Sequence, residues 1–204
     1  MKLFSESCEQ NKEPILEVLQ EVFKDRKKVL EIGSGTGQHA VYFAKYLTHL
    51  NWLPSDRSEN LSSIRAWAEE AALSNLEESI ELDVTNQPWD IQTVDALFTA
   101  NSLHIMSWPM VEQFFIGIGE VLEASGKLLV YGPFSYAGEH TSPSNARFDQ
   151  YLKQQNPLSG VRDFEDLDRL AKQQGLVATN DYAMPANNRC LLWVKSKQNT
   201  GPLV

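Results

Sequence analysis

Three glycines stand at alternate positions, Gly33, Gly35 and Gly37, directly after the mainly apolar stretch Val29–Ile32. Glycine lacks a Cβ, so a backbone that contains it can turn tightly and approach a ligand closely. In open α/β sheets, ligands bind in a crevice at the carboxyl ends of the strands. The spacing therefore predicts a nucleotide-like cofactor site at this turn, and we expect Ser34 to belong to it.

Two acidic residues near this turn favour one class of cofactor over another. Glu31 precedes the first glycine by two positions. A carboxylate there would repel a pyrophosphate and would suit a ligand that carries an ammonium group. The dinucleotide fingerprint G-x-G-x-x-G/A is broken, because Gln38 stands at its sixth position. Asp56 ends the next apolar run, where such folds place a ribose-binding acid. The combination indicates S-adenosylmethionine rather than NAD.

These motifs resemble those of the class I S-adenosylmethionine-dependent methyltransferases. In that superfamily an Asp at the end of the third strand contacts the adenine amino group, and the next backbone N–H meets the ring. Asp83 and Val84 match these two positions. The stretch Asp95–His104 resembles the fourth strand and its loop, which border the methionine part and the methyl group. The resemblance thus implies a cofactor contact for Asn101 and a place near the acceptor for His104.

Motifs outside this core resemble the methyltransferase-like twenty-six family over nearly the whole chain. They are Asn11–Leu16, Tyr131–Phe134, Ser144–Asp149, Gly160–Asp163 and Met184–Asn188. The resemblance implies a fold and a cofactor, S-adenosylmethionine with S-adenosylhomocysteine as its product, but no acceptor. We expect no metal site, since neither cysteine stands in a zinc-type spacing.

Further side chains are candidates for the acceptor side of the site. A hydroxyl acceptor must lose a proton, and His104 is the candidate general base, with a surface or packed histidine as the alternative. His39 would face the methionine carboxylate or serve helix packing. The substrate-side candidates are Asn11, Lys12, Tyr136, Asn145, Phe148, Arg162 and Asn187. Most have a structural alternative, such as a helix cap, rim packing, an ion pair with Asp163 or a hairpin turn.

The elements that must position these residues follow from apolar periodicity and turn signals. We expect one α/β domain over residues 1–204, with a Rossmann-like seven-stranded mixed sheet, helices on both faces and a C-terminal antiparallel hairpin. The expected strands are 28–32, 51–55, 79–82, 94–100, 127–131, 176–184 and 189–195. The expected helices are 38–48, 58–73, one from Ser107 or Trp108 to about 124, stopped by Gly126, and one capped by Asp163 and ending near 174.

Two segments outside this framework are expected to border the site. Residues 1–27 would form a lid on the cofactor side, with a loop from Ser5 to Glu13 and a helix over 14–24 that has Pro14 in its first turn. Residues 132–162, rich in Gly, Pro, Ser and Asn, would form an acceptor-side insertion with a short helix over 146–154. Residues from about 197 to 204 are expected to be frayed.

Composition narrows the function classes. The formal net charge of −9 disfavours a nucleic-acid partner, whose binding depends on clustered Lys and Arg. An amino-methylating Asn-Pro-Pro-Tyr tetrad is absent after the fourth strand, where the sequence reads Asn-Ser-Leu-His. No signal core or membrane-length apolar run is visible, so we expect a cytoplasmic protein without a membrane partner. The predicted function is methyl transfer to a small molecule; a protein or RNA methyltransferase, or a non-catalytic cofactor-binding scaffold, are the alternatives. The oligomeric state stays open.

Overall fold

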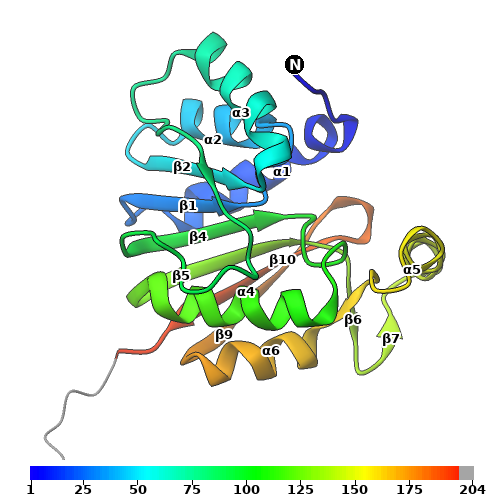
Figure 1. The fold of residues 1–204 in the computed structure, drawn as a ribbon. Coiled ribbons are helices and arrows are strands. Elements are labelled where there is room, and N and C mark those ends of the chain that lie inside the picture. The colour runs from blue at the N-terminus through cyan, green and yellow to red at the C-terminus, as the bar shows by residue number, and fades with distance from the viewer. Residues whose placement is uncertain (198–204) are drawn as a thin grey trace, which may run out of the picture.

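A seven-stranded sheet forms the centre of the computed structural model, which describes residues 1–197 (Figure 1). Its strands are β1 (Lys28–Ile32), β2 (Asn51–Asp56), β3 (Ile80–Glu81), β4 (Val94–Ala100), β5 (Leu122–Gly132), β9 (Leu176–Ala183) and β10 (Arg189–Lys195). Their order is β3-β2-β1-β4-β5-β10-β9. β1 pairs in parallel with β2 and β4, whereas β10 pairs antiparallel with β5 and β9. The expected mixed sheet with a C-terminal antiparallel hairpin is confirmed.

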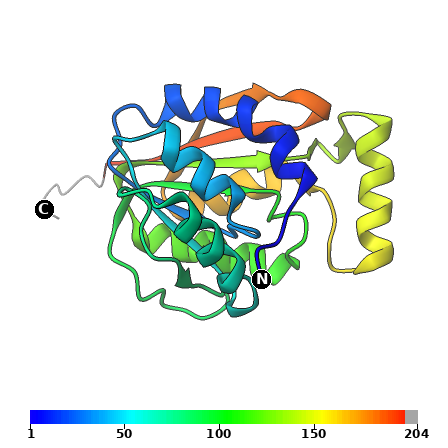
Figure 2. The ribbon, with the colours of Figure 1, turned by 90° about the horizontal axis from the view of Figure 1, so that it is seen from above.

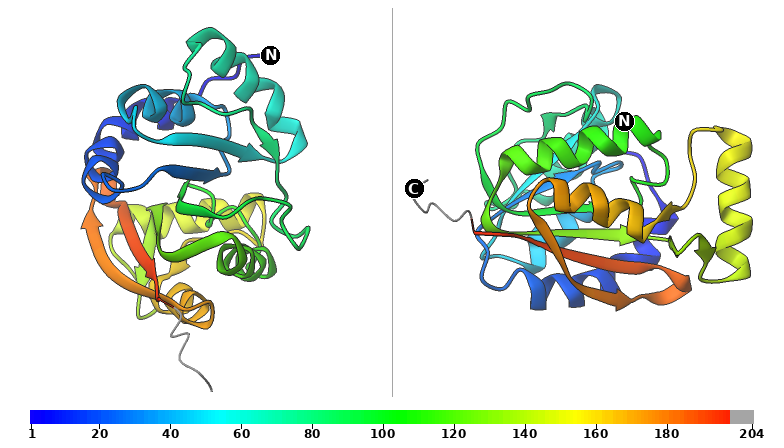
Figure 3. Two further views of the ribbon diagram at one scale, coloured as in Figure 1. Left: turned by 90° about the vertical axis from the view of Figure 1, so that its left-hand side faces the viewer. Right: turned by 90° about the horizontal axis from the view of Figure 1, so that it is seen from below.

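Helices cover both faces of the sheet (Figure 3). α1 (Glu6–Val22) and α2 (Gln38–Tyr46) pack on one face around Phe43, Trp52 and Phe98. α4 (Trp108–Val121) and α6 (Phe164–Gln173) pack on the other, around Phe115 and Trp193. α3 (Ser58–Ala71) packs beside α2 and against β2. The central strands are apolar on both faces because both are covered, as parallel sheets require.

The connection between α4 and β5 differs from the expectation. α4 ends at Val121 and β5 begins at Leu122, so Gly126 lies inside the strand rather than at a helix stop. Leu122 is almost fully buried and pairs with Val94, and the register shifts before the next pair. Burial and pairing of Leu122 therefore end the helix earlier than the glycine signal indicated, while Ser125 takes the left-handed turn (φ +64°).

The start of α1 also differs from the expectation. The loop predicted from Ser5 to Glu13 is wrong, because the helix begins at Glu6 with Ser5 as its N-cap, and Pro14 lies inside it. Ser5 N donates to Gln38 Oε1 (2.6 Å), and Gln38 Nε2 donates to Glu9 Oε1 (2.9 Å). These contacts with α2 hold the first two turns in place despite the hydrogen bond that Pro14 cannot donate.

The segment 132–162 is ordered rather than a plain loop. It contains β6 (Phe134–Tyr136), β7 (Glu139–His140), α5 (Pro143–Gln155) and the start of β8 (Arg162–Asp163), and the three strands form a small second sheet in the order β7-β6-β8. The predicted helix exists but begins earlier, because Ser142 accepts a hydrogen bond from Asn145 N as its cap. α5 lies at the end of the molecule where β5 ends (Figure 2).

The remaining expectations concern the chain ends and α6. Asp163 caps α6 through a hydrogen bond from Glu165 N, as predicted. No helix in the described part of the chain has both the length and the apolar character needed to cross a membrane. The frayed end expected from about residue 197 lies, beyond that residue, outside the described range.

Candidate functional site

A cavity of about 640 Å³ lies at the carboxyl ends of β1, β4 and β5. It is lined by the start of α1, the glycine turn, His39 at the start of α2, the ends of β4 and β5 with their loops, α5, and the connection between β9 and β10. The residues proposed from the sequence that line it are Asn11, Gly33, Ser34, Gly35, Asn101, His104, Asn145, Phe148 and Asn187. The topology accounts for this convergence, since parallel neighbours end at the same edge of a sheet.

Each glycine of the turn has a left-handed backbone, but their surroundings differ. A Cβ on Gly33 would lie 2.6 Å from Ser102 Oγ, and a Cβ on Gly37 would lie 2.8 Å from the Cα of Ile64 in α3. A Cβ on Gly35 (φ +57°) would meet no atom within 4 Å. Gly33 and Gly37 therefore allow close packing inside the protein, whereas Gly35 presents its backbone to open space beside the cavity.

Asp56 holds the glycine turn from the end of β2. One carboxylate oxygen accepts from Gly35 N (2.6 Å), and the other accepts from Arg57 N (2.7 Å) and Asn60 Nδ2 (2.9 Å). An ionised carboxylate offers about four acceptor positions, and three are taken here. The side chain is nearly buried and does not line the cavity. Its ribose contact stays a prediction, with room for about one more hydrogen bond.

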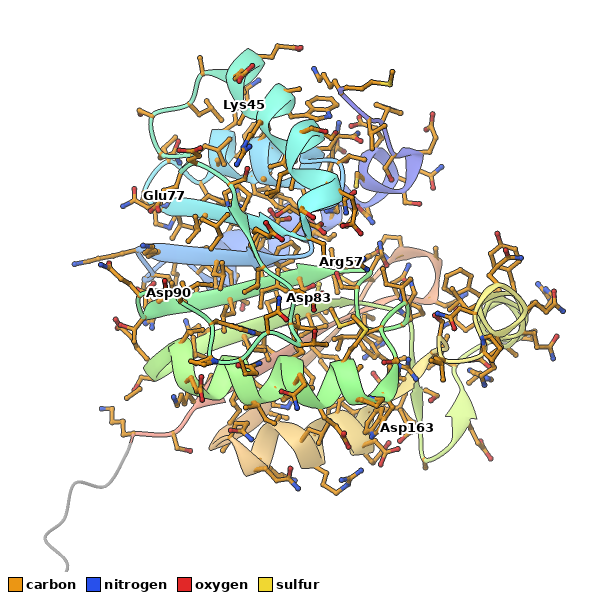
Figure 4. The ribbon with its side chains drawn as sticks, viewed as in Figure 1. Lys45, Arg57, Glu77, Asp83, Asp90 and Asp163 are labelled. Atoms are coloured by element: carbon orange, nitrogen blue, oxygen red, sulfur yellow. The ribbon has the colours of Figure 1, made fainter. Side chains whose placement is uncertain are left out.

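The proposed adenine residues lie outside the cavity, beyond the end of β2. Asp83 accepts from Thr85 N (2.9 Å) and Thr85 Oγ1 (2.7 Å), and the bond from the Thr85 backbone is the main reason why the pKa of Asp83 is lowered. The Arg57 guanidinium lies 4.0 Å from its carboxylate (Figure 4). Val84 is buried in the core on the α4 side. Their contact with an adenine ring stays a prediction.

Glu31 is buried in β1 and does not line the cavity. Its side chain is 1% exposed, and Trp52 Nε1 donates a hydrogen bond of 2.9 Å to Oε2. Burial raises the pKa of Glu31 to about 7, against the opposing effect of the Trp52 bond. The carboxyl group is therefore near its titration midpoint at neutral pH, and its expected contact with an ammonium group stays a prediction.

His104 faces the cavity from the loop after β4. That loop begins at Asn101, which has a left-handed backbone (φ +58°) and donates its N–H to Tyr131 O. The imidazole of His104 is 7% exposed and meets the ring of Phe148 edge-on, with centroids 5.3 Å apart. Burial, and secondarily the charge of Arg162, lowers the pKa of His104 to about 4. The imidazole is therefore unprotonated at pH 7, and its low pKa makes it a weaker base than a solvated histidine.

Arg162 holds the loop that carries His104 and does not line the cavity. Its guanidinium donates to Leu103 O (3.0 Å) and to Met106 O, on either side of the histidine. Gly160 N donates to His104 O (2.9 Å). Arg162 therefore donates to backbone carbonyl groups, and no ion pair with Asp163 is seen among the described residues. Its contact with an acidic substrate stays a prediction.

α5 is fastened to the β9–β10 connection at the edge of the cavity. Asn145 Nδ2 donates to Asn187 O (3.0 Å), and Asn187 Nδ2 donates to Ser144 Oγ (3.1 Å). Asn187 has a left-handed backbone (φ +59°), so it makes the turn and also lines the cavity. Phe148 lines the cavity one helical turn after Ser144.

Tyr136 and Lys12 lie outside the cavity. The hydroxyl of Tyr136 donates to Asp181 Oδ2 (2.7 Å), which makes the tyrosine part of the sheet surface near β9. The ammonium of Lys12 pairs with Glu9 and lies 5.0 Å from the centroid of the Tyr42 ring. Their contact with an acceptor stays a prediction.

The first turns of α1 contribute cavity residues that the sequence did not single out. Cys8 lies one helical turn before Asn11, and both line the cavity. Asn11 Oδ1 is 2.7 Å from His39 Nε2, and burial lowers the pKa of His39 to about 4. Residues three positions apart lie on the same face of a helix. Had the predicted helix been extended back to Glu6, the spacing of Cys8 and Asn11 would have indicated that both face the cavity. His39 stacks on Phe43, which confirms its role in packing, and it also lines the cavity. Its contact with the methionine carboxylate stays a prediction.

Solved structures share this fold at low sequence identity. An O-methyltransferase family protein from Burkholderia thailandensis is 14% identical, with a TM-score of 0.80 over 91% of this chain and 56% of that one. The S-adenosylmethionine-dependent methyltransferase SibL is 20% identical, with a TM-score of 0.79 over 94% and 56%. An O-methyltransferase family 2 protein from Planctomyces limnophilus, in complex with apigenin, is 18% identical, with a TM-score of 0.73 over 85% and 52%. The chain spans just over half the length of these structures.

The likeness to these methyltransferases concerns the fold alone. A family model described as "Protein of unknown function (DUF938)" matches residues 2–195. This range includes every residue that lines the cavity. The chain therefore belongs to the family of proteins of unknown function named DUF938.

Proposed function

We propose that this protein is an S-adenosylmethionine-dependent methyltransferase of the methyltransferase-like twenty-six family, and that it acts on a small-molecule acceptor. One observation carries the proposal. A left-handed glycine, Gly35, opens onto the same cavity as the buried, neutral imidazole of His104. The cavity thus combines a backbone surface suited to a bound cofactor with a group that can take a proton.

The glycine turn supports the assignment of the cofactor. A side chain on Gly35 would occupy the space that the bare backbone leaves open beside the cavity. Gly33, Ser34 and Asn101 line the same end and would hold the cofactor, with Asp56 contributing its remaining acceptor position. Bound S-adenosylmethionine would supply a methyl group that its sulfonium already activates.

The chain then needs to orient an acceptor and remove its proton. Correct orientation of reactants supplies roughly 7–11 kcal/mol in favourable cases. α5 and the β9–β10 connection line the cavity together with the glycine turn, so they would orient the acceptor and exclude water. His104 would take the proton of an acceptor hydroxyl, and the hydrogen bonds from Arg162 and Gly160 would keep its loop in place.

A hydroxyl acceptor is favoured over a nucleobase or protein amide. His104 is uncharged, as a general base must be before it takes a proton, and its place in the cavity would put it beside the acceptor. The matched solved structures include O-methyltransferase family proteins, one of them with apigenin, a small molecule. The net charge of −9 disfavours RNA as the acceptor.

The test has a binding step and a turnover step. Calorimetry should show binding of S-adenosylhomocysteine and no measurable binding of NAD. Mass spectrometry of a metabolite extract, incubated with the protein and methyl-labelled S-adenosylmethionine, should then show a labelled product. His104→Gln should lower turnover by about 10²–10⁴-fold without loss of S-adenosylhomocysteine binding. His49→Gln, at an exposed position away from the cavity, is the matched control.

Each outcome decides something different. Absence of S-adenosylhomocysteine binding would refute the cofactor assignment. Binding without any labelled product would indicate a cofactor-binding scaffold. Equal turnover of His104→Gln and His49→Gln would remove His104 as the base and leave the methyltransferase assignment standing.

A further inference from the structure

We infer that the acceptor is an uncharged, ring-bearing hydroxy compound, selected by the part of the cavity that is lined by the end of β5, α5, the β9–β10 connection and His104. We call this part the acceptor half. This acceptor half consists of Tyr131, Pro133, Asn145, Phe148, Pro185 and the imidazole of His104. The inference rests on the proposed function, and it concerns which molecules can enter that half.

The polar groups of the acceptor half are neutral and already oriented. Both N–H groups of Asn145 are donated, to Thr141 Oγ1 (2.9 Å) and to Asn187 O (3.0 Å), so Oδ1 is the atom left to accept a hydrogen bond. The hydroxyl of Tyr131 is a neutral phenol, because burial raises its pKa to about 12. The imidazole of His104 is neutral as well. These groups can bind hydroxyl, carbonyl or amide functions.

Three charged side chains on elements around the acceptor half have partners within the protein. Arg162 donates to backbone carbonyl groups of the His104 loop. Lys153 pairs with Asp149 (2.6 Å) on α5, and Arg189 pairs with Asp181 (2.7 Å) beside the β9–β10 connection. Among the residues that the structure describes, those lining the cavity are all uncharged types at pH 7.

An ionised acceptor would therefore enter without a counterion. A charge that is removed from water without a partner carries a large desolvation penalty, whereas a neutral polar group needs only its hydrogen bonds. The end of the cavity at the glycine turn can accept a negative charge, because α2 begins there at Gln38 and the N–H groups of a first helical turn favour an anion. The acceptor half is therefore the part of the cavity that selects against charged acceptors.

The apolar surface of the acceptor half favours a ring. Phe148 stands edge-on to His104, and Pro133, Pro185 and Ala186 supply further apolar surface. Aromatic rings prefer offset or edge-to-face contact with one another, which adds to the gain from burying their area. A planar ring with a hydroxyl group would use both the apolar surface and the neutral hydrogen-bonding groups.

Three matched phenols test the inference: 4-hydroxybenzamide, 4-hydroxybenzoate and 4-hydroxybenzylamine, which are neutral, anionic and cationic at pH 7. Their binding to the full chain, with saturating S-adenosylhomocysteine, is measured by ligand-observed NMR titration. We expect the neutral amide to bind at least about tenfold more tightly than either ion. Equal or tighter binding of the benzoate or the benzylamine, or no binding of all three, would overturn the inference.

A variant pair on α5 tests the location. Phe148→Arg places a cation in the acceptor half and should turn the preference toward the benzoate. Tyr151→Arg, on the same helix at a position that is 56% exposed, should keep the wild-type order. If folded Phe148→Arg binds the three phenols in the same order of affinity as the wild type, the acceptor half is not where the selection takes place. If that variant does not fold, the wild-type comparison of the three phenols decides the inference.

The labelled extract separates this inference from the proposed function. A product labelled from methyl-labelled S-adenosylmethionine should pass through both anion- and cation-exchange resins at pH 7. A labelled product retained by either resin would leave the methyltransferase assignment intact and overturn the acceptor class. If no labelled product forms, the proposed function fails, and the three phenols alone decide whether the acceptor half selects neutral rings.

Discussion

Gly35 offers a test in which stability and ligand binding can be separated. Gly35→Ala would place a Cβ in open space beside the cavity, at a residue with φ +57°. Gly138 is a matched control, because it has φ +78°, no atom within 4 Å of a built Cβ, and a position in the β6–β7 turn outside the cavity. Both variants therefore introduce the same backbone strain, and only one of them alters the cavity.

The expected magnitudes follow from the backbone. A left-handed conformation costs a residue with a Cβ roughly 1–2 kcal/mol, and the lower chain entropy of unfolded alanine returns about 0.4–1 kcal/mol. We therefore expect each variant to lose about 1 kcal/mol in its free energy of unfolding. Gly33→Ala should lose more, since its Cβ would also lie 2.6 Å from Ser102 Oγ.

Binding should distinguish the two variants. Gly35→Ala should weaken S-adenosylhomocysteine binding at least about tenfold, whereas Gly138→Ala should bind like the wild type. Urea denaturation gives the stabilities, and calorimetry on the folded variants gives the dissociation constants. If Gly35→Ala binds S-adenosylhomocysteine as tightly as Gly138→Ala does, the glycine turn is a packing feature and the cofactor site lies elsewhere.

Three further predictions follow from the site. As the pH is lowered, kcat/KM should decrease only near pH 4, because burial lowers the pKa of His104 to about 4. A decrease centred near pH 6.5 would show instead that the base is a solvated histidine. Glu31→Gln should gain up to about 3 kcal/mol in its free energy of unfolding relative to the wild type between pH 5 and 9. The folded-state pKa of Glu31 is raised to about 7, so its stabilising contribution is present below the unfolded pKa and is lost as the pH rises through 7. If urea denaturation shows the same dependence of stability on pH for both proteins across this range, this prediction is wrong. Asp56→Ala should weaken S-adenosylhomocysteine binding about tenfold or more, since even one charge-assisted hydrogen bond is worth roughly 1.5–3 kcal/mol. The control variant Asp90→Ala, at an exposed site, should bind S-adenosylhomocysteine as the wild type does. Equal dissociation constants for the two variants would make Asp56 a purely structural residue.

Local signals were sufficient for the framework of this protein. Strand β1 and the turn after it have the bounds that the sequence indicates, because apolar runs and alternate glycines restrict the backbone locally. The seven-stranded mixed sheet and its C-terminal antiparallel hairpin also agree with the expectation. Boundaries failed where a distant contact competed with a local signal, as at Leu122, which pairs with Val94 instead of continuing a helix to Gly126.

The sequence also indicated residue types better than their roles. Arg162 and Tyr136 were expected on the substrate side, yet their polar groups bind Leu103 O and Asp181. The sequence does not show whether a charged or hydroxyl-bearing side chain already has hydrogen-bond partners within the folded protein. Cys8 was missed for the opposite reason, because its helix depends on contacts with Gln38, thirty positions away in the chain.

By itself, the sequence determined the α/β class, the seven strands and a glycine turn suited to a cofactor, since periodicity and backbone freedom act over a few residues. Only the tertiary structure decided which side chains share the cavity and which are buried or already paired. It placed Asn145 and Phe148 in the same cavity as Gly35, and it lowered the pKa of His104 by burial. Burial and pairing depend on segments far apart in the chain, and no local pattern records them.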